Sequence, residues 1–254
     1  MGDMKIAVVS DIHSNLEALS AVLEDIERNG VEEIYCLGDV VGYGPNPQEV
    51  LDLSRRFKFT LLGNHDGAVL NEAGIANFNW IAAMAVHWTR RRIMPDPKGE
   101  PDEVKRGNQE FLSGLKQMET VGRVLFAHGT CNNNMEYIFQ YSDAVPTFRY
   151  MAATGLTTCF VGHTHIPCVF TEEGGSVVQK EGAVYPSVGK GQRLIVNVGS
   201  VGQPRDKDWR ACYVIVDGTE ILYRRVEYDV EATIAKIYEI DELNNFLGDR
   251  LKRK

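Results

Sequence analysis

The chain has 254 residues, of which 44% are hydrophobic and 24% are charged, and its formal net charge is −8. This length is enough to bury a large core, and α/β proteins of this size often form one domain, so we expect a single domain over residues 1–254. No apolar run approaches the roughly 20 residues of a membrane span, so we expect no membrane partner. The negative charge disfavours non-specific binding to nucleic acid.

The start of the chain and its cysteines predict the compartment. Residues 1–6 lead directly into a strand pattern, so we expect no signal peptide, and Ile6 stands where N-myristoylation needs Ser or Thr. The five cysteines mostly lie within apolar runs: Cys36, Cys131, Cys159, Cys168 and Cys212. They form no Cys-x-x-Cys pair, which disfavours a zinc–thiolate site and is typical of reduced core residues. We therefore expect a cytoplasmic protein.

The first quarter of the chain alternates strand and helix patterns. Runs rich in β-branched and aromatic residues predict strands at 5–10, 33–37 and 57–62. The run Ser14-Asn15-Leu16-Glu17 matches a capping box that opens an amphipathic helix, which Asn29-Gly30 closes. Asn46-Pro47 begins another helix. The order βαβαβ predicts parallel strands joined by right-handed crossovers.

Residues 67–120 interrupt this alternation, and we expect a helical insertion there. A helix at 78–93 is followed by a loop rich in Pro, Gly and charge at 95–107 and a short helix around Phe111, Leu115 and Met118. The insertion covers either the core or the mouth of the site. His87 lies on the first of these helices without ligand partners nearby in the sequence, so we expect no function for it.

The second half of the chain predicts a second sheet. Strand patterns occur at 123–127, 157–161, 169–171, 194–198, 212–216 and 221–226. Short turns such as Asp217-Gly218 indicate antiparallel hairpins. Residues 230–254 match one or two amphipathic helices with a basic end. A second sheet packed on the first, with helices outside, gives an α/β fold arranged as a four-layer α/β/β/α sandwich with two mixed sheets.

Side chains able to bind metal follow five of the predicted strands. In an open α/β sheet such residues gather at the carboxyl ends of the strands, in the crevice that the loops form. Residues i and i+2 of an extended chain point to the same side, about 6.6 Å apart, so such a pair binds one ion or reaches two neighbours. The sequence therefore predicts two adjoining metal sites built from seven residues: Asp11, His13, Asp39, Asn64, His128, His163 and His165.

The motifs that carry these residues resemble those of the calcineurin-like metallophosphoesterase superfamily. In chain order they are Asp11-Ile12-His13, Gly38-Asp39, Gly63-Asn64-His65-Asp66, His128-Gly129 and Gly162-His163-Thr164-His165. Residues 197–205 resemble the ending found in the small prokaryotic phosphodiesterase branch of that superfamily. The resemblance covers most of the chain and implies the same four-layer fold.

The resemblance also implies a role for each residue. The implied ligands of the first ion are Asp11, His13 and His165, those of the second are Asn64, His128 and His163, and Asp39 bridges the two. His65 matches the catalytic histidine, which stabilises transition-state charge or protonates the leaving oxygen; as an alternative, it only orients Asn64. Two divalent cations would activate water and neutralise phosphoryl charge, and mixed Asn, Asp and His ligation suits Mn, Fe, Zn, Co or Ni.

One departure from the better-known branches indicates the substrate. Protein phosphatases and symmetrical dinucleoside tetraphosphatases follow the bridging Asp with Val-Asp-Arg-Gly, whereas this chain has Val40-Val41-Gly42-Tyr43-Gly44. The carboxylate that orients the catalytic histidine and the phosphate-binding arginine are both missing. When a guanidinium is missing, a monoester dianion loses more binding energy than a diester monoanion does. We therefore expect a phosphodiesterase acting on small phosphodiesters. Arg205 either restores a cationic contact to the substrate or is solvated beside Asp206 and Asp208.

Three other interpretations remain open at this point. The first is a phosphomonoesterase or protein phosphatase of the same fold. The second is a non-catalytic, metal-binding interaction scaffold, which the presence of His65 and the full ligand set disfavours. The third is a metallo-β-lactamase-like hydrolase, but residues 163–167 lack the second half of its His-x-His-x-Asp-His motif. The sequence does not indicate the oligomeric state, and specificity would lie in loops at 43–47, 132–137 and 204–209.

Overall fold

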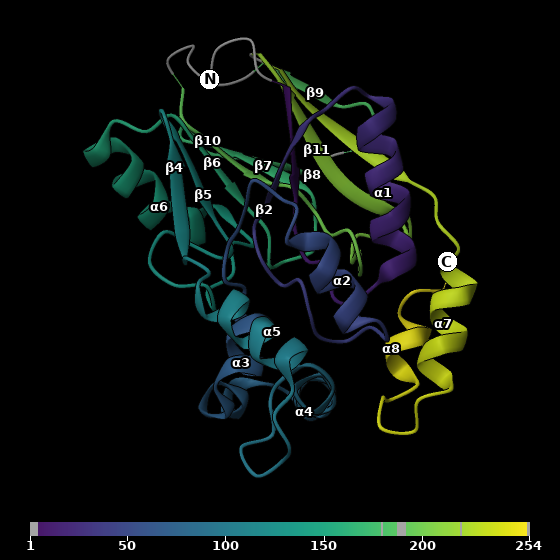
Figure 1. The fold of residues 1–254 in the computed structure, drawn as a ribbon. Coiled ribbons are helices and arrows are strands. Elements are labelled where there is room, and N and C mark those ends of the chain that lie inside the picture. Colours follow the sequence, from purple (N-terminus) through teal and green to yellow (C-terminus); the bar gives the residue numbers. More distant parts are fainter. Residues whose placement is uncertain (1–4, 179, 187–191, 219, 253–254) are drawn as a thin grey trace.

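The computed structural model of the protein describes residues 5–178, 180–186, 192–218 and 220–252. Two mixed sheets form its centre, and helices cover their outer faces (Figure 1). The strands are β1 (Lys5–Val9), β2 (Glu33–Cys36), β3 (Phe59–Thr60), β4 (Met118–Val121), β5 (Val124–Ala127), β6 (Thr158–Val161), β7 (Cys168–Thr171), β8 (Ser176–Val178), β9 (Val184–Pro186), β10 (Leu194–Asn197), β11 (Ala211–Asp217) and β12 (Glu220–Val226). The helices are α1 (Leu16–Arg28), α2 (Pro47–Ser54), α3 (Asn64–Leu70), the 3-10 helix η1 (Glu72–Asn77), α4 (Trp80–Ile93), α5 (Glu103–Ser113), α6 (Tyr141–Thr154), α7 (Val230–Tyr238) and α8 (Phe246–Asp249).

The first sheet has the strand order β3-β2-β1-β11-β12-β9. Its strands β1, β2 and β3 are parallel, as the βαβαβ pattern predicts, while β11 and β12 form an antiparallel hairpin beside β1. Neighbouring residues of a strand point to opposite faces of a sheet. Ala7 and Val9 therefore pack in the core under α1, whereas Ile6 and Val8 pack toward the second sheet.

The second sheet has the strand order β4-β5-β6-β10-β7-β8. Strands β5, β6 and β10 are parallel, and the remaining strands pair antiparallel. On its outer face Phe148 and Met151 of α6 pack against Leu125 and Cys159. Between the sheets, large side chains of both sheets, such as Tyr35 and Phe126, share one core. The predicted four-layer α/β/β/α arrangement with two mixed sheets is confirmed.

The start of α1 differs from its prediction. The N-cap is Asn15, whose Oδ1 accepts from the backbone N–H of Ala18 at 3.1 Å, so the predicted capping box from Ser14 to Glu17 is wrong. Ser14 has a left-handed backbone with φ 54°, and the Glu17 carboxylate instead accepts from the Thr233 hydroxyl at 2.8 Å. A contact with α7 therefore replaces the local cap interaction.

The region 67–120 is helical, but its boundaries differ from the prediction. Helix α5 begins at Glu103, where the Asp102 side chain accepts from the backbone N–H of Lys105. The loop expected at 95–107 is therefore shorter in the structure than in the prediction. Met118 lies in β4 rather than in a helix, because residues 118–121 pair antiparallel with β5. Helix α6 and strands β8 and β9 were not predicted; Pro146 inside α6 conceals its helical pattern. Residues 1–4, 253 and 254, which entered the sequence predictions, lie outside the described residues.

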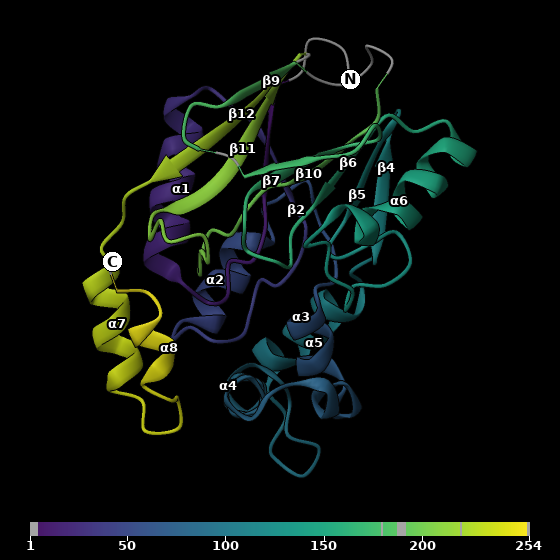
Figure 2. The same ribbon diagram turned by 180° about the vertical axis from the view of Figure 1, so that it is seen from behind.

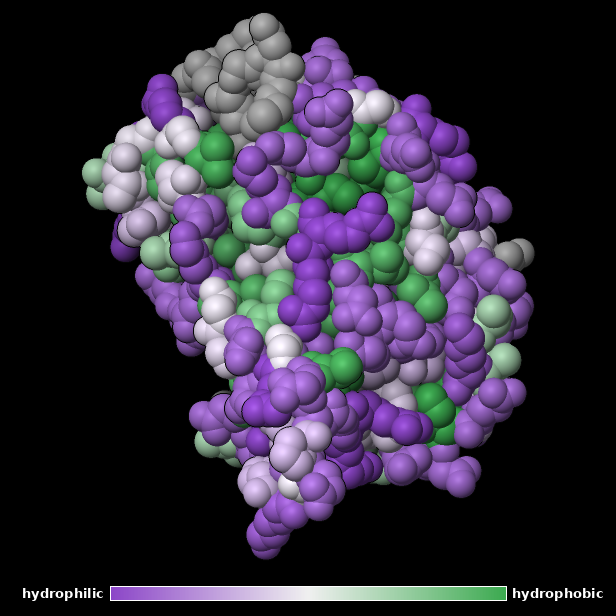
Figure 3. Space-filling view, viewed as in Figure 1, coloured by the Kyte–Doolittle hydropathy of each residue, from purple (hydrophilic) through white to green (hydrophobic). Residues whose placement is uncertain are grey.

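The helices α3–α5 and α7–α8 lie beyond the end of the two sheets that is opposite the N-terminus, and both ribbon views agree on this (Figure 1, Figure 2). The face in Figure 3 is mostly hydrophilic, with hydrophobic residues gathered mainly in its upper half. Within the described ranges, no helix combines the length and the apolar character that a membrane crossing requires.

Candidate metal centre

The seven predicted ligands all lie in or beside loops that follow parallel strands. Asp11 and His13 follow β1, Asp39 follows β2, and Asn64 is the first residue of α3 after β3. The remaining three are His128 after β5, and His163 and His165 after β6. All seven side chains are buried. Tertiary packing thus brings together residues that are up to 154 positions apart in the chain, Asp11 and His165.

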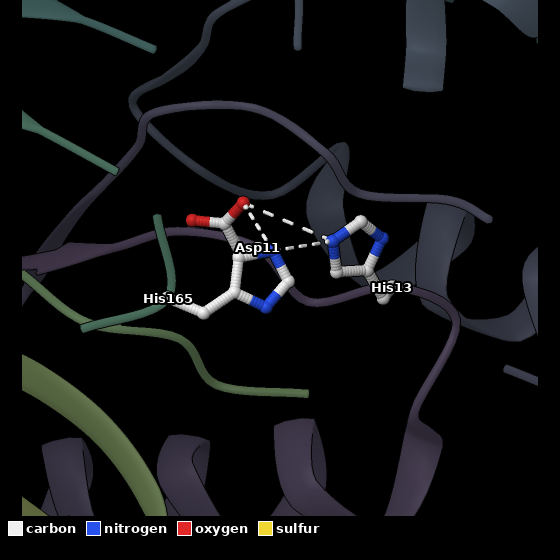
Figure 4. Close-up of side chains that lie close together, drawn as sticks. All are labelled: Asp11, His13 and His165. Carbon is white, nitrogen blue, oxygen red and sulfur yellow. Dashed lines mark hydrogen bonds and ion pairs between the residues drawn. The ribbon is translucent and has the colours of Figure 1, made fainter. Parts of the chain in front are cut away.

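Asp11, His13 and His165 place three ligand atoms within 4.8 Å of one another (Figure 4). The Nδ1–H of His13 donates to the Val41 carbonyl at 3.2 Å, and that of His165 donates to the Gln203 carbonyl at 2.7 Å. In a neutral imidazole the other nitrogen then carries a lone pair. These two Nε2 atoms are 3.2 Å apart, and the Asp11 Oδ1 lies 3.3 Å from that of His165. Three acceptors therefore converge on one point.

His128, His163 and Asn64 form a second group of the same kind. The Nδ1–H of His128 donates to the Leu37 carbonyl at 3.1 Å, and the Nε2–H of His163 donates to the Met135 carbonyl at 3.3 Å. The remaining ring nitrogens face each other at 3.2 Å, and the Asn64 Oδ1 lies 3.1 Å from the His128 Nε2. Once His128 gives up its Nε2 proton, as metal binding requires, lone pairs face one another here too.

The Asp39 carboxylate lies between the two groups. Its Oδ2 is 3.6 Å from the Nε2 of His13 and 3.4 Å from the Nε2 of His128, while its Oδ1 accepts from the backbone N–H of His65 at 2.8 Å. One oxygen is thus shared by the two sets of imidazoles. The Asp39 carboxylate therefore contacts both groups of candidate ligands.

The electrostatics of the cluster favour positive charge inside it. Burial lowers the pKa of His13, His163 and His165, so these rings are neutral at pH 7 and keep their lone pairs. Burial opposes a charge on His128 as well, but the Asp39 carboxylate outweighs it and raises the pKa of His128 to about 9. Imidazole, amide and carboxylate donors that converge in this way fit first-row divalent metal ions.

The loops of the cluster have unusual backbone conformations. Positive φ values are costly for residues other than glycine and concentrate at functional sites. Five of the proposed ligands have φ between 48° and 66°: Asp11, His13, Asp39, His163 and His165. The strained loops are packed tightly, since a Cβ atom on Gly63 would lie 2.0 Å from the Asp39 Oδ1, and one on Gly162 would lie 2.6 Å from the Asp11 Oδ2.

His65 lies beside the cluster, where the sequence places the catalytic histidine. Its ring contacts Tyr43, His13 and Phe78 with centroid distances of 4.3, 4.8 and 4.7 Å. Burial lowers the pKa of His65 to about 4, so the ring is neutral at pH 7. Among the residues that the structure describes, its buried Nδ1 has no hydrogen-bond partner, and this atom faces Gly42, where a Cβ would lie only 2.5 Å away. His65 is therefore positioned by neighbouring rings and by the Asp39 carboxylate, which accepts from its backbone N–H at 2.8 Å and has an oxygen within 4.8 Å of a ring nitrogen.

Three residues that hold the ligand loops received no role from the sequence. The Asn197 Nδ2 donates to the Gly162 carbonyl and to the Thr164 hydroxyl at 2.6 and 2.9 Å, which fixes the loop that carries two histidines. The Ser200 hydroxyl donates to the backbone carbonyl of Asp11. The Asp66 carboxylate accepts from the backbone N–H groups of the residues at 41 and 63. The motifs contained these residues, but only their contacts show what they hold.

Two aromatic residues were also missed. Tyr43 has φ 58° and lies against both His13 and His65. Tyr137 is 43% exposed and stacks on His163 with a centroid distance of 3.8 Å and an interplanar angle of 16°. The only sequence signal was their place in loops expected to set specificity. Tyr137 provides an exposed ring next to the cluster.

Arg205 lies at the edge of the cluster. Its backbone N–H donates to the His165 carbonyl at 3.1 Å, and its guanidinium donates to the Gln203 side chain at 3.0 Å. The neighbouring acids Asp206 and Asp208 form ion pairs with other arginines. Arg205 therefore lies beside His165, while its acidic neighbours pair with other arginines. His87, for which no function is expected, lies exposed on α4, within the helical region beyond the sheets.

Fold and site together define a metal-binding α/β/β/α protein, and comparison with known proteins gives its family. The calcineurin-like phosphoesterase superfamily domain matches residues 4–220. An uncharacterised protein of Methanocaldococcus jannaschii is 40% identical over 97% of this chain and 96% of its own. The chain belongs to the calcineurin-like phosphoesterase superfamily, a family of metal-dependent phosphoester hydrolases.

Solved structures agree with this assignment. A metallophosphoesterase from Sphaerobacter thermophilus is 34% identical, with 99% of both chains covered and a TM-score of 0.83. A hypothetical protein of Pyrococcus horikoshii is 19% identical, with 98% of both chains covered and a TM-score of 0.76, which shows the same fold. The predicted resemblance to metallophosphoesterases and the predicted fold are confirmed.

Proposed function

We propose that this protein hydrolyses small phosphodiesters with two divalent cations bound at the candidate metal centre. The observation that carries the proposal is the pair of acceptor clusters joined by Asp39. Asp11, His13 and His165 would hold one cation, and Asn64, His128 and His163 the other. Cations at these positions supply water activation and neutralise charge on the phosphoryl oxygens.

The chain itself contributes His65 to the reaction. A neutral imidazole keeps one N–H, which can donate to a phosphoryl oxygen or to the leaving oxygen in the transition state. The backbone bond from His65 to Asp39 and the packing of Tyr43 hold the ring next to the bridging carboxylate. This favours a catalytic role over one of merely orienting Asn64, because the Asn64 Oδ1 lies against the His128 Nε2 and the His65 Nδ1 has no hydrogen-bond partner among the described residues.

Two features support a diester rather than a monoester as the substrate. The loop after β2 carries Gly42 and Tyr43 instead of a carboxylate and an arginine, and Tyr43 lies against the site without adding charge. The Arg205 guanidinium lies at the edge of the cluster, where its charge acts on His65 and His165. Fewer cationic contacts suit a monoanionic diester better than a dianionic monoester.

The test compares bis(p-nitrophenyl) phosphate with p-nitrophenyl phosphate, using protein stripped of metal and refilled with Mn²⁺. We expect metal-dependent turnover of the diester that His65→Ala lowers by about 10² to 10⁴-fold without loss of Mn²⁺ binding. His87→Ala is the matched control, since this exposed histidine lies on α4. Faster turnover of the monoester would identify a phosphomonoesterase. Tight Mn²⁺ binding without turnover of either ester would indicate an interaction scaffold.

A further inference from the structure

A second feature beside the metal centre is a basic pocket of about 350 Å³ between the loop at 204–209 and the C-terminal helix α8. Its lining includes four cationic side chains and two aromatic ones: Arg205, Lys207, Arg250, Lys252, Trp209 and Phe246. In a chain of net charge −8, four cations around one pocket form an unusual local excess of positive charge.

The acidic residues of the pocket do not neutralise its arginines. Asp208 pairs with Arg210 at 2.8 Å, and Asp249 pairs with Lys252 at 2.5 Å. Among the residues that the structure describes, neither Arg205 nor Arg250 forms an ion pair with a carboxylate within 4.0 Å. Within the described part of the chain, the buried Nε of Arg205 also has no hydrogen-bond partner. Two guanidinium groups are thus left with unused donors.

The two arginines are close enough to affect each other. Burial lowers the pKa of Arg250, and the positive charge of Arg205 lowers it further. Like charges that share a partly buried pocket repel each other, and this repulsion favours binding of an anion between them. A guanidinium binds phosphate oxygens with two parallel N–H donors.

The pocket adjoins the metal centre through Arg205, whose backbone N–H donates to the His165 carbonyl at 3.1 Å, and Tyr43 lies nearby. The ring of Tyr43 lies 4.7 Å from that of His13 and 4.3 Å from that of His65. The charges of Arg205 and Arg250 both act on the Tyr43 phenol. A substrate whose scissile phosphate lies at the cations can therefore place a second group in the pocket.

We propose that Arg205 and Arg250 form a binding site for a second phosphate group of the substrate. The substrate class is then a small phosphodiester that also carries a phosphomonoester, such as a phosphorylated nucleotide ester. This inference rests on the proposed phosphodiesterase function, because it places the scissile diester at the metal centre. The net negative charge of the chain restricts the class to short anions rather than long nucleic acids.

Two chromogenic diesters that differ by one phosphate test the proposal. These are the p-nitrophenyl ester of thymidine 5′-phosphate and the same ester with a 3′-phosphate. With Mn²⁺-loaded protein, we expect the KM of the 3′-phosphorylated ester to be lower by about tenfold, since charge-assisted bonds favour it. Arg250→Ala should bring the ratio of the two KM values close to one, and Arg250→Lys should give an intermediate ratio.

Arg56→Ala is the matched control, because Arg56 is exposed and lies in a cleft with residues that precede β2, at the opposite end of the sheet. It removes the same charge and should leave the KM ratio unchanged. If it changes the ratio as much as Arg250→Ala does, the preference comes from overall charge and the proposed phosphate site is wrong.

Calorimetric binding of thymidine 3′,5′-bisphosphate and thymidine 5′-phosphate to the same proteins separates the two proposals. Equal KM values together with equal affinities, while both esters are cleaved, would overturn the second phosphate site and leave the phosphodiesterase standing. Tighter binding of the bisphosphate that depends on Arg250, with no cleavage of either ester, would support the anion site and overturn the phosphodiesterase.

Discussion

The Asp39 carboxylate contacts both the metal centre and His65. Its Oδ1 accepts from the His65 backbone N–H at 2.8 Å, while its Oδ2 lies between the imidazoles of His13 and His128. The side chain expected to bridge two cations therefore also fixes the start of the helix that carries the proposed catalytic histidine. Metal binding and the position of His65 are linked through one residue.

Replacing Asp39 by Asn tests this link. The Asn side chain would present either its NH₂ group or an uncharged oxygen to the facing imidazoles. We therefore expect the Mn²⁺ affinity to fall by at least about 10- to 100-fold, and diester turnover to fall with it. Calorimetric titration with Mn²⁺ measures the affinity. Asp52→Asn, which changes an exposed carboxylate on α2, is the control. Unchanged Mn²⁺ affinity in Asp39→Asn would exclude Asp39 as a ligand.

Metal removal should lower the thermal stability of the protein. A cation that binds only the folded state stabilises it by about 2.7 kcal/mol at a concentration of 100 times Kd. We therefore expect a higher Tm with Mn²⁺ than with EDTA, measured by differential scanning fluorimetry. His163→Ala should reduce this difference, and the exposed His87→Ala should not. A Tm that EDTA does not change would contradict a structural contribution of bound metal.

Asn197→Ala should weaken both the fold and the metal centre. The Asn197 side chain is buried and forms hydrogen bonds to Gly162, Thr164 and Gly199, and truncation removes all three and leaves the buried Gly199 N–H without its partner. We expect a loss of about 2 kcal/mol in the free energy of unfolding.

Urea denaturation measures the stability of the Asn197 variant, and a titration measures its Mn²⁺ affinity, which should fall because the loop with His163 and His165 is no longer fixed. Thr154→Ala, a change at an exposed α6 residue with a local hydrogen bond to the Tyr150 carbonyl, is the comparison. If Mn²⁺ affinity stays at the wild-type value despite the lost stability, Asn197 is purely structural.

A buried contact far from the site gives a pH-dependent prediction. Asp25 of α1 accepts from the Tyr213 hydroxyl at 2.8 Å and from the Arg224 guanidinium at 2.9 and 3.0 Å. Burial opposes ionisation, but the Arg224 and Tyr213 hydrogen bonds outweigh it and lower the pKa of Asp25. At neutral pH we expect Asp25→Asn to lower the free energy of unfolding by about 2 kcal/mol. This is less than breaking a fully buried ion pair would cost, because Arg224 is partly exposed.

The sign of the pH dependence follows from the lowered pKa of Asp25. A carboxylate whose pKa is lower in the folded state stabilises the fold fully above its unfolded value of about 3.9, and this contribution is lost as the pH falls through the folded-state value. Urea unfolding of wild type and Asp25→Asn should therefore differ by about 2 kcal/mol near pH 7, and the difference should shrink below about pH 4. A difference that grows toward low pH would contradict this assignment.

The candidate ligand residues and the layers of the fold that hold them can be predicted from the sequence alone. Continuous apolar runs such as Ile6 to Val9 indicate strands that are buried on both faces, and polar residues after strands identify one edge of a sheet. Strands β1, β2, β5 and β6 were predicted for this reason. The strand predicted at 57–62 pairs with β2 over only two residues, whereas α6 with its internal Pro146 and the strand at 118–121 carry weak local signals, because tertiary contacts stabilise them more than their own propensities do.

Which ligand atoms lie close to one another depends on the tertiary structure. Backbone carbonyls of residues 37, 41, 135 and 203 select the imidazole tautomers, and no sequence pattern indicates which nitrogen will face the centre. Sequence patterns also do not indicate that the Tyr43 ring lies against the His65 ring. Nor do they indicate that Arg250 shares a pocket with Arg205, from which it is 45 residues apart in the chain. The chemistry of each side chain is local, whereas ligand geometry and pocket charge depend on contacts between distant segments.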